Sequence, residues 1–157
     1  MEIDDYDCDE NMKICIVSSC GGHLTEVRLL KPIYEKFDHF YVLNEKIDLP
    51  GDMVGKTHFI RHSERDWLFI MNLWEAYMIF RKERPNLVIS TGAGPAVPFC
   101  IIGKVFRIRS IFIETSAQVM TPSLTGRILY YMADEFYYQW ENLRNYYPKG
   151  IFGGLLY

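Results

Sequence analysis

The stretch ICIVSSCGGHL (14–24) carries the chain from an apolar run into a glycine-rich turn. Its first four residues are all apolar, as expected of a β-strand that is covered on both faces. Apolar residues then recur at mostly helical spacing as far as Phe37, and Pro32 is expected to interrupt that helix. The two glycines and His23 therefore lie where a strand turns into a helix. Such a turn either closes a tight bend or holds an anion.

The same alternation of strand and helix continues along the chain. Apolar runs predict strands, and longer periodic segments predict helices; the expected strands are 40–44, 57–61, 87–91, 110–115 and 135–140, and the expected helices are 66–84, 95–106, 124–134 and 141–147. Alternating elements of this kind form βαβ units with a parallel sheet. We therefore predict one α/β, Rossmann-like domain over 12–157 with a mostly parallel sheet. The acidic, polar residues 1–11 are expected to be a disordered extension.

Composition excludes several classes of function. A chain of 157 residues suits one domain, and a net charge of −3 gives no support to a nucleic-acid partner. The 4 cysteines form no CxxC pair and no signal peptide opens the chain, which favours a reduced, cytoplasmic protein. The dinucleotide fingerprint and the P-loop are both absent, and Cys20 and His23 lack further ligands at metal-binding spacing. We expect neither a cofactor nor a metal.

Three polar loops follow predicted strands: SSCGGH (18–23), GAGP (92–95) and TSAQ (115–118). Ligands of parallel sheets bind at the carboxyl ends of the strands, and a glycine-rich turn before a helix suits a phosphate. A tight turn explains one pair of glycines equally well, but two glycine-rich turns on different strands favour a binding site. His23 is a candidate phosphate donor or general base, with helix capping as the alternative. Glu114 ends an apolar strand, where it either orients a sugar hydroxyl or pairs with an arginine.

Taken together, SSCGGHLTEV (18–27), STGAGPAVP (90–98) and the segment FIETSAQVMTPSLTGRILYYMADEFYYQWENLRNYYP (112–148) resemble the acceptor-side subunit of split glycosyltransferases. The eukaryotic member of this family anchors an N-acetylglucosaminyltransferase that acts on dolichyl-diphosphate-N-acetylglucosamine, and bacterial members assist capsule and exopolysaccharide synthesis. The resemblance covers nearly the whole chain. It implies the N-terminal half of a GT-B enzyme, similar to that of the single-chain peptidoglycan glycosyltransferase, while a separate catalytic subunit carries the UDP-sugar site.

The resemblance also implies roles for individual residues. By this match the acceptor diphosphate is held by Ser19, Cys20, Gly21, Gly22, His23, Gly92, Gly94, Pro95 and Thr115. His23 and Glu114 are the candidates for a catalytic role, in deprotonating the acceptor hydroxyl. Cys20 departs from the family pattern, because a small residue is expected there for close backbone approach. The eukaryotic subunit also has an N-terminal transmembrane helix that this sequence lacks.

A polyprenyl-diphosphate-linked saccharide as acceptor requires contact with a membrane surface. Segment 67–80 is apolar over most of a helix circumference and precedes a basic cluster, as in interfacial helices, and FCIIGKVFRIR (99–109) repeats this pattern. The alternative is a fully buried core helix. The predicted membrane contacts are Trp67, Phe69, Phe80, Arg81, Lys82 and Arg84.

The C-terminal tail is apolar to its last residue, whereas free termini are usually polar. The family resemblance points to the catalytic subunit as its binding partner, and packing on the chain's own first helix is the alternative. The predicted partner interface is Ile151, Phe152, Leu155, Leu156 and Tyr157.

These observations favour the acceptor- and membrane-binding subunit of a heteromeric glycosyltransferase that makes a lipid-linked saccharide, peripheral on the inner face of the cell membrane and inactive alone. A membrane scaffold without substrate contact is the second hypothesis. A self-sufficient small transferase is the third.

Overall fold

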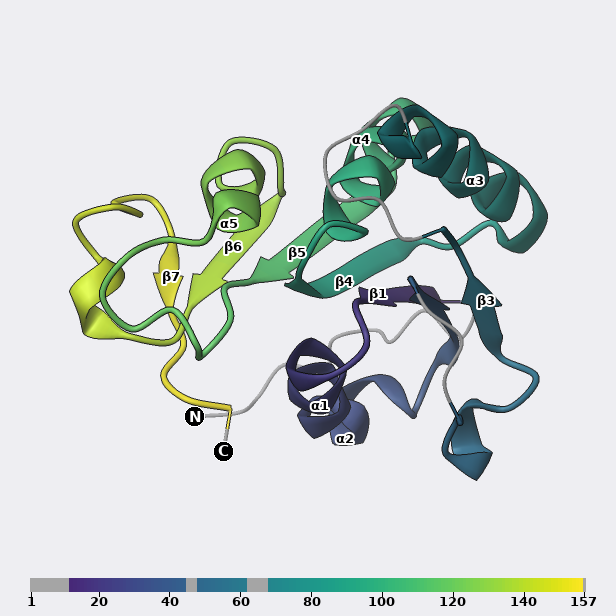
Figure 1. The fold of residues 1–157 in the computed structure, drawn as a ribbon, viewed down its shortest axis with the longest axis horizontal. Helices are drawn as coiled ribbons and strands as arrows, with labels where there is room; N and C mark the ends of the chain where they lie inside the picture. Colours follow the sequence, from purple (N-terminus) through teal and green to yellow (C-terminus); the bar gives the residue numbers. More distant parts are fainter. Residues whose placement is uncertain (1–11, 45–47, 62–67, 157) are drawn as a thin grey trace, which may run out of the picture.

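The computed structural model describes residues 12–44, 48–61 and 68–156, and the predicted extension 1–11 lies outside this range. The described residues form one parallel sheet with helices on both faces (Figure 1). Its strands are β1 (Lys13–Ser18), β2 (Asp38–Leu43), β3 (Thr57–Phe59), β4 (Leu87–Gly92), β5 (Arg109–Ile113), β6 (Glu135–Tyr138) and β7 (Ile151–Phe152). The helices are α1 (Gly22–Leu29), α2 (Lys31–Tyr34), α3 (Leu68–Glu83), α4 (Ala96–Phe106) and α5 (Leu124–Leu129), with 3₁₀ turns η1 (Gly51–Met53) and η2 (Glu141–Leu143).

The strand order is β3-β2-β1-β4-β5-β6-β7, and every pair of neighbours is parallel. The predicted Rossmann-like α/β fold is therefore confirmed. The direction of winding reverses between β1 and β4. Figure 1 shows the consequence: α1 and α2 lie on one face of the sheet, while α3 and α4 cover the other. In such sheets the ligand site lies at this switch point, outside the carboxyl ends of the two strands.

Strand β1 contributes to the core on both of its faces. Cys15 and Val17 pack with Phe80 and Phe99 of the helices on one face. Ile14 and Ile16 belong to a second cluster, with α1 and α2, on the other face. This alternation explains why the run at 14–17 is apolar throughout, as predicted.

The predicted helices 24–37 and 124–134 are both shorter in the structure. α1 ends at Leu29, and Pro32 stands in the first turn of the separate helix α2, which confirms the expected interruption. α5 ends at Leu129, because the chain must turn so that the Asp134 carboxylate can accept hydrogen bonds from Ser110 at the start of β5.

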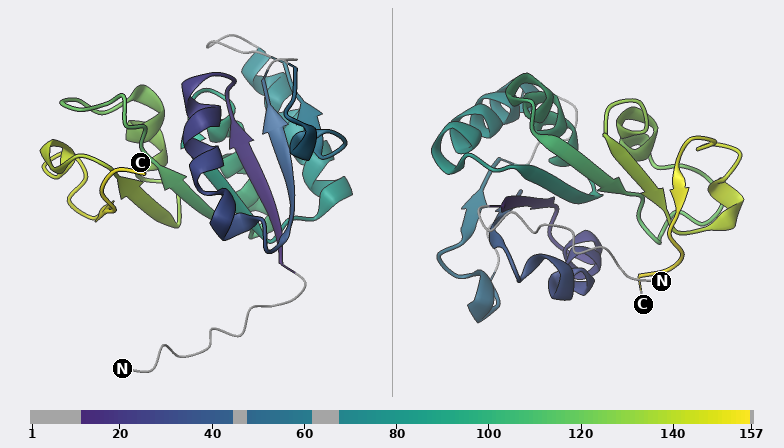
Figure 2. Two further views of the ribbon diagram at one scale, coloured as in Figure 1. Left: turned by 90° about the horizontal axis from the view of Figure 1, so that it is seen from below. Right: turned by 180° about the vertical axis from the view of Figure 1, so that it is seen from behind.

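The C-terminal segment also differs from the prediction. The expected helix 141–147 is reduced to the turn η2, followed by further turns up to Gly150. The sequence then adds an unpredicted short strand, β7, which pairs with β6. Figure 2 shows this segment at the edge of the sheet, with the tail running back toward the α1–α2 face.

Candidate functional site

The glycine-rich turn after β1 and the turn after β4 meet at the switch point of the sheet. The Thr91 hydroxyl donates to the His23 carbonyl (2.9 Å), and the His23 ring returns a contact to the Thr91 carbonyl through Nδ1 (3.1 Å). The structure therefore brings together two of the loops that the sequence analysis singled out. His23 contacts Thr91, 68 positions away near the end of β4, and its ring lies against Gly92 at the start of the second loop.

The contact with Thr91 indicates which nitrogen of the His23 ring carries the proton. A carbonyl oxygen accepts hydrogen bonds and donates none, so Nδ1 must be the protonated nitrogen of the neutral ring. Nε2 is then the basic nitrogen. The His23 side chain is 27% exposed, so this nitrogen belongs to a group that a substrate can reach.

Gly92 forms the wall on which the His23 ring rests. A Cβ built on Gly92 would lie 2.9 Å from both Nδ1 and Cε1 of the ring, and the residue has φ of 130°. Only glycine provides both the space and the backbone conformation here. The next residue, Ala93, also has positive φ (67°), which is uncommon outside glycine.

The start of α1 offers backbone donors. Its first turn begins at Gly22 after Gly21, which has φ of 99°, and no side chain among the described residues caps it. The first N–H groups of a helix have no intrahelical partner and attract anions. Gly21 and Gly22 are exposed, and a Cβ on either would meet open space. The predicted phosphate loop is thus open to solvent rather than filled by side chains.

The other predicted phosphate ligands surround this turn to different degrees. Ser19 and Cys20 are half-buried, and the Cys20 amide donates to the Asn44 side chain (3.2 Å). Gly94 is exposed in the second loop, whereas Pro95 is buried at the start of α4.

Glu114 lies in the core and not in the cleft. It has no exposed surface, and its carboxylate accepts hydrogen bonds from the Tyr147 hydroxyl (2.5 Å) and the Ser123 amide (3.2 Å). Burial, together with this hydrogen bond, raises the pKa of Tyr147 well above its usual range. The carboxylate ties α5 and the segment after η2 to the end of β5. A group buried in this way cannot reach a substrate, so the structure removes the basis for the catalytic role predicted for Glu114.

A second buried carboxylate, Glu26, was missed by the sequence analysis. It is 5% exposed and reaches from α1 to the loop after β5, where Oε1 accepts from the Thr115 hydroxyl (3.0 Å) and the Ser116 amide (2.7 Å). Thr115 is itself buried and joined to the site through this bond. The pattern HLTEV carried the signal, because it places an acid one turn after His23 among the residues that face the core.

Helix α3 has one buried stripe and one exposed apolar stripe. Asn72, Ala76 and Phe80 are buried, so Phe80 is a core residue and not the surface contact predicted for it. The opposite side exposes Ile70 (68%), Trp74 (63%) and Met78 (49%). A fully buried helix is thereby excluded.

We call this surface the α3 stripe: Ile70, Trp74 and Met78 with the exposed basic residues Arg81, Lys82 and Arg84. Phe69 is half-buried, and Trp67 lies outside the described residues. Val105, 71% exposed, adds an apolar side chain from the neighbouring helix α4. Among the described residues, no helix combines the length and apolar character needed to cross a bilayer.

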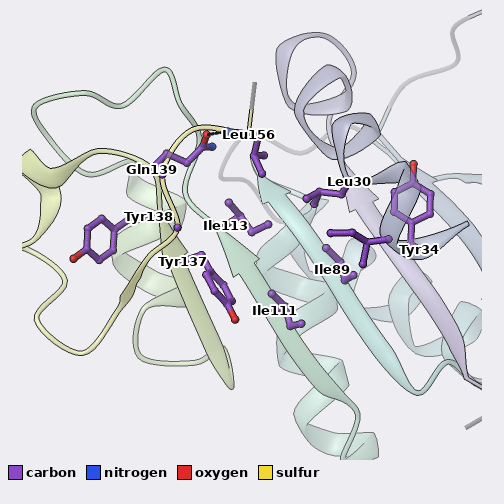
Figure 3. A pocket seen from close by; sticks show the side chains of 12 residues that line it. Leu30, Tyr34, Ile89, Ile111, Ile113, Tyr137, Tyr138, Gln139 and Leu156 are labelled. Atoms are coloured by element: carbon purple, nitrogen blue, oxygen red, sulfur yellow. Dashed lines mark hydrogen bonds between the residues drawn. The ribbon is translucent and has the colours of Figure 1, made fainter. Parts of the chain in front are cut away.

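The C-terminal tail borders an apolar cavity of about 350 Å³ on the α1–α2 face of the sheet (Figure 3). Its lining joins the sheet, the α1–α2 connection and the tail, and consists of Leu30, Ile33, Tyr34, Ile89, Ile111, Ile113, Tyr137, Tyr138, Gln139, Gly153, Gly154 and Leu156. The Leu156 amide donates to the Gln139 side chain (3.1 Å), which holds the tail at the rim. Of the predicted interface residues, Ile151, Phe152 and Leu155 are exposed, and Tyr157 lies outside the described range.

The chain also matches a known protein family. Residues 63–156 match the family described as "Oligosaccharide biosynthesis protein Alg14 like". The chain belongs to the Alg14-like family. The resemblance stated from the motifs is confirmed.

Mammalian Alg14 proteins match most of the chain, and the yeast protein matches about half of it. The human protein, named UDP-N-acetylglucosamine transferase subunit ALG14, is 25% identical over 179 residues, covering 92% of this chain and 83% of that protein. The Saccharomyces cerevisiae subunit of the same name is 37% identical over 84 residues, covering 46% of this chain and 34% of that protein.

Solved structures with the same fold are longer than this chain. MurG from Acinetobacter baumannii aligns with a TM-score of 0.68 at 12% identity, covering 83% of this chain and 42% of MurG. UDP-N-acetylglucosamine 2-epimerase from Rickettsia bellii aligns with a TM-score of 0.71 at 13% identity, covering 93% of this chain and 45% of the epimerase. The chain thus spans less than half of these neighbours, and the likeness shows the fold alone.

Proposed function

We propose that this chain is the acceptor-binding subunit of a heteromeric glycosyltransferase that makes a lipid-linked saccharide. In this role it holds the diphosphate of a polyprenyl-linked acceptor and brings a separate catalytic subunit to the membrane. The observation that carries the proposal is the meeting of the two glycine-rich turns at His23, with open amides at the start of α1. An anion at this place gains both the helix dipole and unpaired N–H donors.

Each part of the site has a distinct task in this proposal. The amides of the first turn of α1 bind the diphosphate. His23 faces the acceptor through Nε2 and takes the proton of its hydroxyl as that oxygen attacks the sugar of a UDP-linked donor. The donor site is assigned to a separate catalytic subunit, because a GT-B cleft lies between two Rossmann-like domains and the described residues form one such sheet.

Two further surfaces support the recruiting role. The α3 stripe combines exposed apolar residues with basic ones, which suits an anionic lipid surface. The cavity beside the tail offers apolar area to the catalytic subunit. The curated relatives are named as subunits of a UDP-N-acetylglucosamine transferase, which supports N-acetylglucosamine as the donated sugar. Service in capsule or exopolysaccharide synthesis is a further proposal of the same kind.

The test is His23→Ala and Gly22→Val in the assembled complex, assayed with labelled UDP-N-acetylglucosamine and a polyprenyl-diphosphate acceptor. We expect His23→Ala to lower the rate by about 100-fold, the range of a general base, and Gly22→Val to raise the KM for the acceptor. Gly51→Ala is the control, because its Cβ would meet open space and the residue belongs to the turn η1. Co-purification of the two subunits should be unchanged in all three variants.

The same experiment tests the scaffold hypothesis. A scaffold that never contacts substrate keeps full activity in both site variants, and that result would contradict acceptor binding. The third reading, a self-sufficient transferase, requires the purified chain alone to transfer sugar from a labelled UDP-sugar. We expect no transfer from the chain alone.

A further inference from the structure

Glu26 is a buried carboxylate with one oxygen fully used and the other unused. Oε1 accepts hydrogen bonds from the Thr115 hydroxyl and from both the amide and the hydroxyl of Ser116. Oε2 is also buried, yet within the described part of the chain it has no hydrogen-bond partner. A buried oxygen of this kind is costly unless something charged or polar approaches it.

The imidazole ring of His23 faces this oxygen. Nδ1 lies 3.8 Å from Glu26 Oε2 and 3.1 Å from the Thr91 carbonyl oxygen. Both are acceptors, and both are on the side of the ring away from Nε2. Gly92, whose Cβ would come within 2.9 Å of the ring, limits its movement toward β4. Among the described residues, the ring is thus faced by one carboxylate and one carbonyl.

We infer that Glu26 is a positioning residue, which holds His23 as the Nδ1–H tautomer and stabilises the imidazolium formed during sugar transfer. This inference rests on the proposed function. In the step concerned, the acceptor O–H bond breaks and its proton moves to His23 Nε2. The freed oxygen forms a bond to the anomeric carbon of the UDP-sugar, and the bond from that carbon to UDP breaks, with the electron pair leaving on the diphosphate. The ring then carries a positive charge opposite Oε2.

The geometry explains why the oxygen is left without a partner. In the neutral ring, Nδ1–H donates to the Thr91 carbonyl oxygen at 3.1 Å. Glu26 Oε2 lies 0.7 Å farther from Nδ1, at 3.8 Å against 3.1 Å. Once the ring is protonated, attraction to a buried carboxylate at this distance is much stronger than in water. The carboxyl group is held in position before the reaction by the three donors on Oε1.

Glu26→Gln separates this role from a structural one. The glutamine oxygen can accept the hydrogen bonds from Thr115 and Ser116, which keeps the loop in place. The amide nitrogen then replaces Oε2 and presents a donor to the Nδ1–H of His23. Ser116→Ala is the matched control, because it removes one donor to Oε1 and leaves Oε2 in place.

The first measurement is the ¹⁵N spectrum of the His23 ring in the full chain, at a pH where the imidazole is neutral. We expect the Nδ1–H tautomer in the wild type and in Ser116→Ala, and a clear population of the Nε2–H tautomer in Glu26→Gln. The second is steady-state kinetics of the assembled complex, where Glu26→Gln should lower kcat at least about tenfold while KM for the acceptor changes less than about twofold.

The outcomes separate this inference from the proposed function. An unchanged ring spectrum in Glu26→Gln overturns the inference, as does a changed spectrum with unchanged kcat. Equal effects of Glu26→Gln and Ser116→Ala would also overturn it, because they indicate a purely structural role for the loop. Failure of the proposed function is recognised differently, by full activity of the complex in His23→Ala.

Discussion

Gly126 occupies a position in which any side chain would meet the buried carboxylate of Glu114. A Cβ there would lie 1.9 Å from Glu114 Oε2 and 2.5 Å from the Tyr147 hydroxyl. Alanine is the better helix former by about 1 kcal/mol, but overpacking a tight core costs about 3 kcal/mol, so the clash outweighs the propensity. We expect Gly126→Ala to lower the free energy of unfolding by about 2 kcal/mol, measured by urea denaturation. Gly51→Ala, whose Cβ would lie in open space, should change the free energy of unfolding by less than about 0.5 kcal/mol. An equal loss of stability in the two variants would contradict the close packing of the Glu114 carboxylate against Gly126.

Buried tyrosines make the protein sensitive to alkali. Burial raises the pKa of Tyr34, and burial with the Glu114 contact raises that of Tyr147. In the unfolded chain these phenols ionise near the usual value of 10.0, whereas in the folded chain they stay protonated. The stability that they contribute is therefore complete below about pH 10 and is lost as the pH rises further.

The measurement is the free energy of unfolding in urea between about pH 8 and pH 11. The slope above about pH 10 should be smaller in Tyr34→Phe than in the wild type, by up to about 1.4 kcal/mol per pH unit. Tyr131→Phe is the control, because that ring is 85% exposed and meets water in both states. A Tyr34→Phe curve parallel to that of the wild type would contradict the prediction.

At the residue scale, sequence patterns identified residues whose chemical type is unusual at their position. They missed residues whose importance depends on contacts with distant parts of the chain. His23 and the glycines stand out because few other roles need them at a strand-to-helix turn. Glu26 accepts a hydrogen bond from Thr115, which is 89 positions away in the chain. Tyr147 donates one to Glu114, which is 33 positions away. A local pattern does not report such distant contacts, although HLTEV did place Glu26 one turn after His23. For the same reason the prediction that Glu114 reaches the cleft rested only on its place at the end of a strand.

At the scale of elements, α3 carries a prediction about lipid. The α3 stripe includes Arg81 and Lys82, both exposed, and each basic residue at an anionic surface contributes about 1 kcal/mol. Arg81→Glu with Lys82→Glu should weaken binding to phosphatidylserine-containing vesicles at least about 30-fold, measured by sedimentation at about 0.1 M salt. Ile70→Ser with Trp74→Ser should weaken binding to neutral vesicles as well.

A matched control is available for the charge change. Lys56→Glu with Lys149→Glu alters the net charge equally, and both lysines are exposed on other segments of the chain. If this pair weakens vesicle binding as much as the changes on α3, the attraction belongs to the net charge of the molecule and the α3 stripe has no special role.

Element boundaries were predictable where a single residue sets them. Pro32 divides the first helix as expected, because proline removes a ladder donor. The early end of α5 and the strand β7 depend instead on distant partners, Ser110 and strand β6. A helix that is apolar on most of its sides does not show from sequence which side is buried. For this reason Phe80 was predicted at the surface, whereas it is buried in the structure.

At the scale of the whole molecule, the alternation of apolar strands and helices was enough to predict a parallel sheet, and the order of motifs was enough to predict the family. The strand order itself decides more than either, because it brings the carboxyl ends of β1 and β4 together at the switch point. The cavity beside the tail depends on three regions far apart in sequence, so it could not be foreseen.

That cavity provides the test of partnership. Leu156 lines it, whereas Leu155, 43% exposed, is not among the lining residues. If the catalytic subunit fills the cavity, Leu156→Glu places a carboxylate in a buried apolar contact, which costs several kcal/mol. In a pull-down from a lysate of the source organism, we expect Leu156→Glu to recover at least about tenfold less UDP-N-acetylglucosamine transferase activity than the wild type. Leu155→Glu should recover nearly the wild-type activity. Deletion of 151–157 should abolish recovery.

The alternative, that the tail only packs on the chain's own first helix, predicts a different pair of results. Leu156→Glu would then lower the free energy of unfolding of the isolated chain while the recovered activity per folded molecule stayed constant. Because both quantities are measured on the same variant, loss of the partner with unchanged stability can arise only from an interface at this cavity, and loss of stability with a retained partner contradicts it.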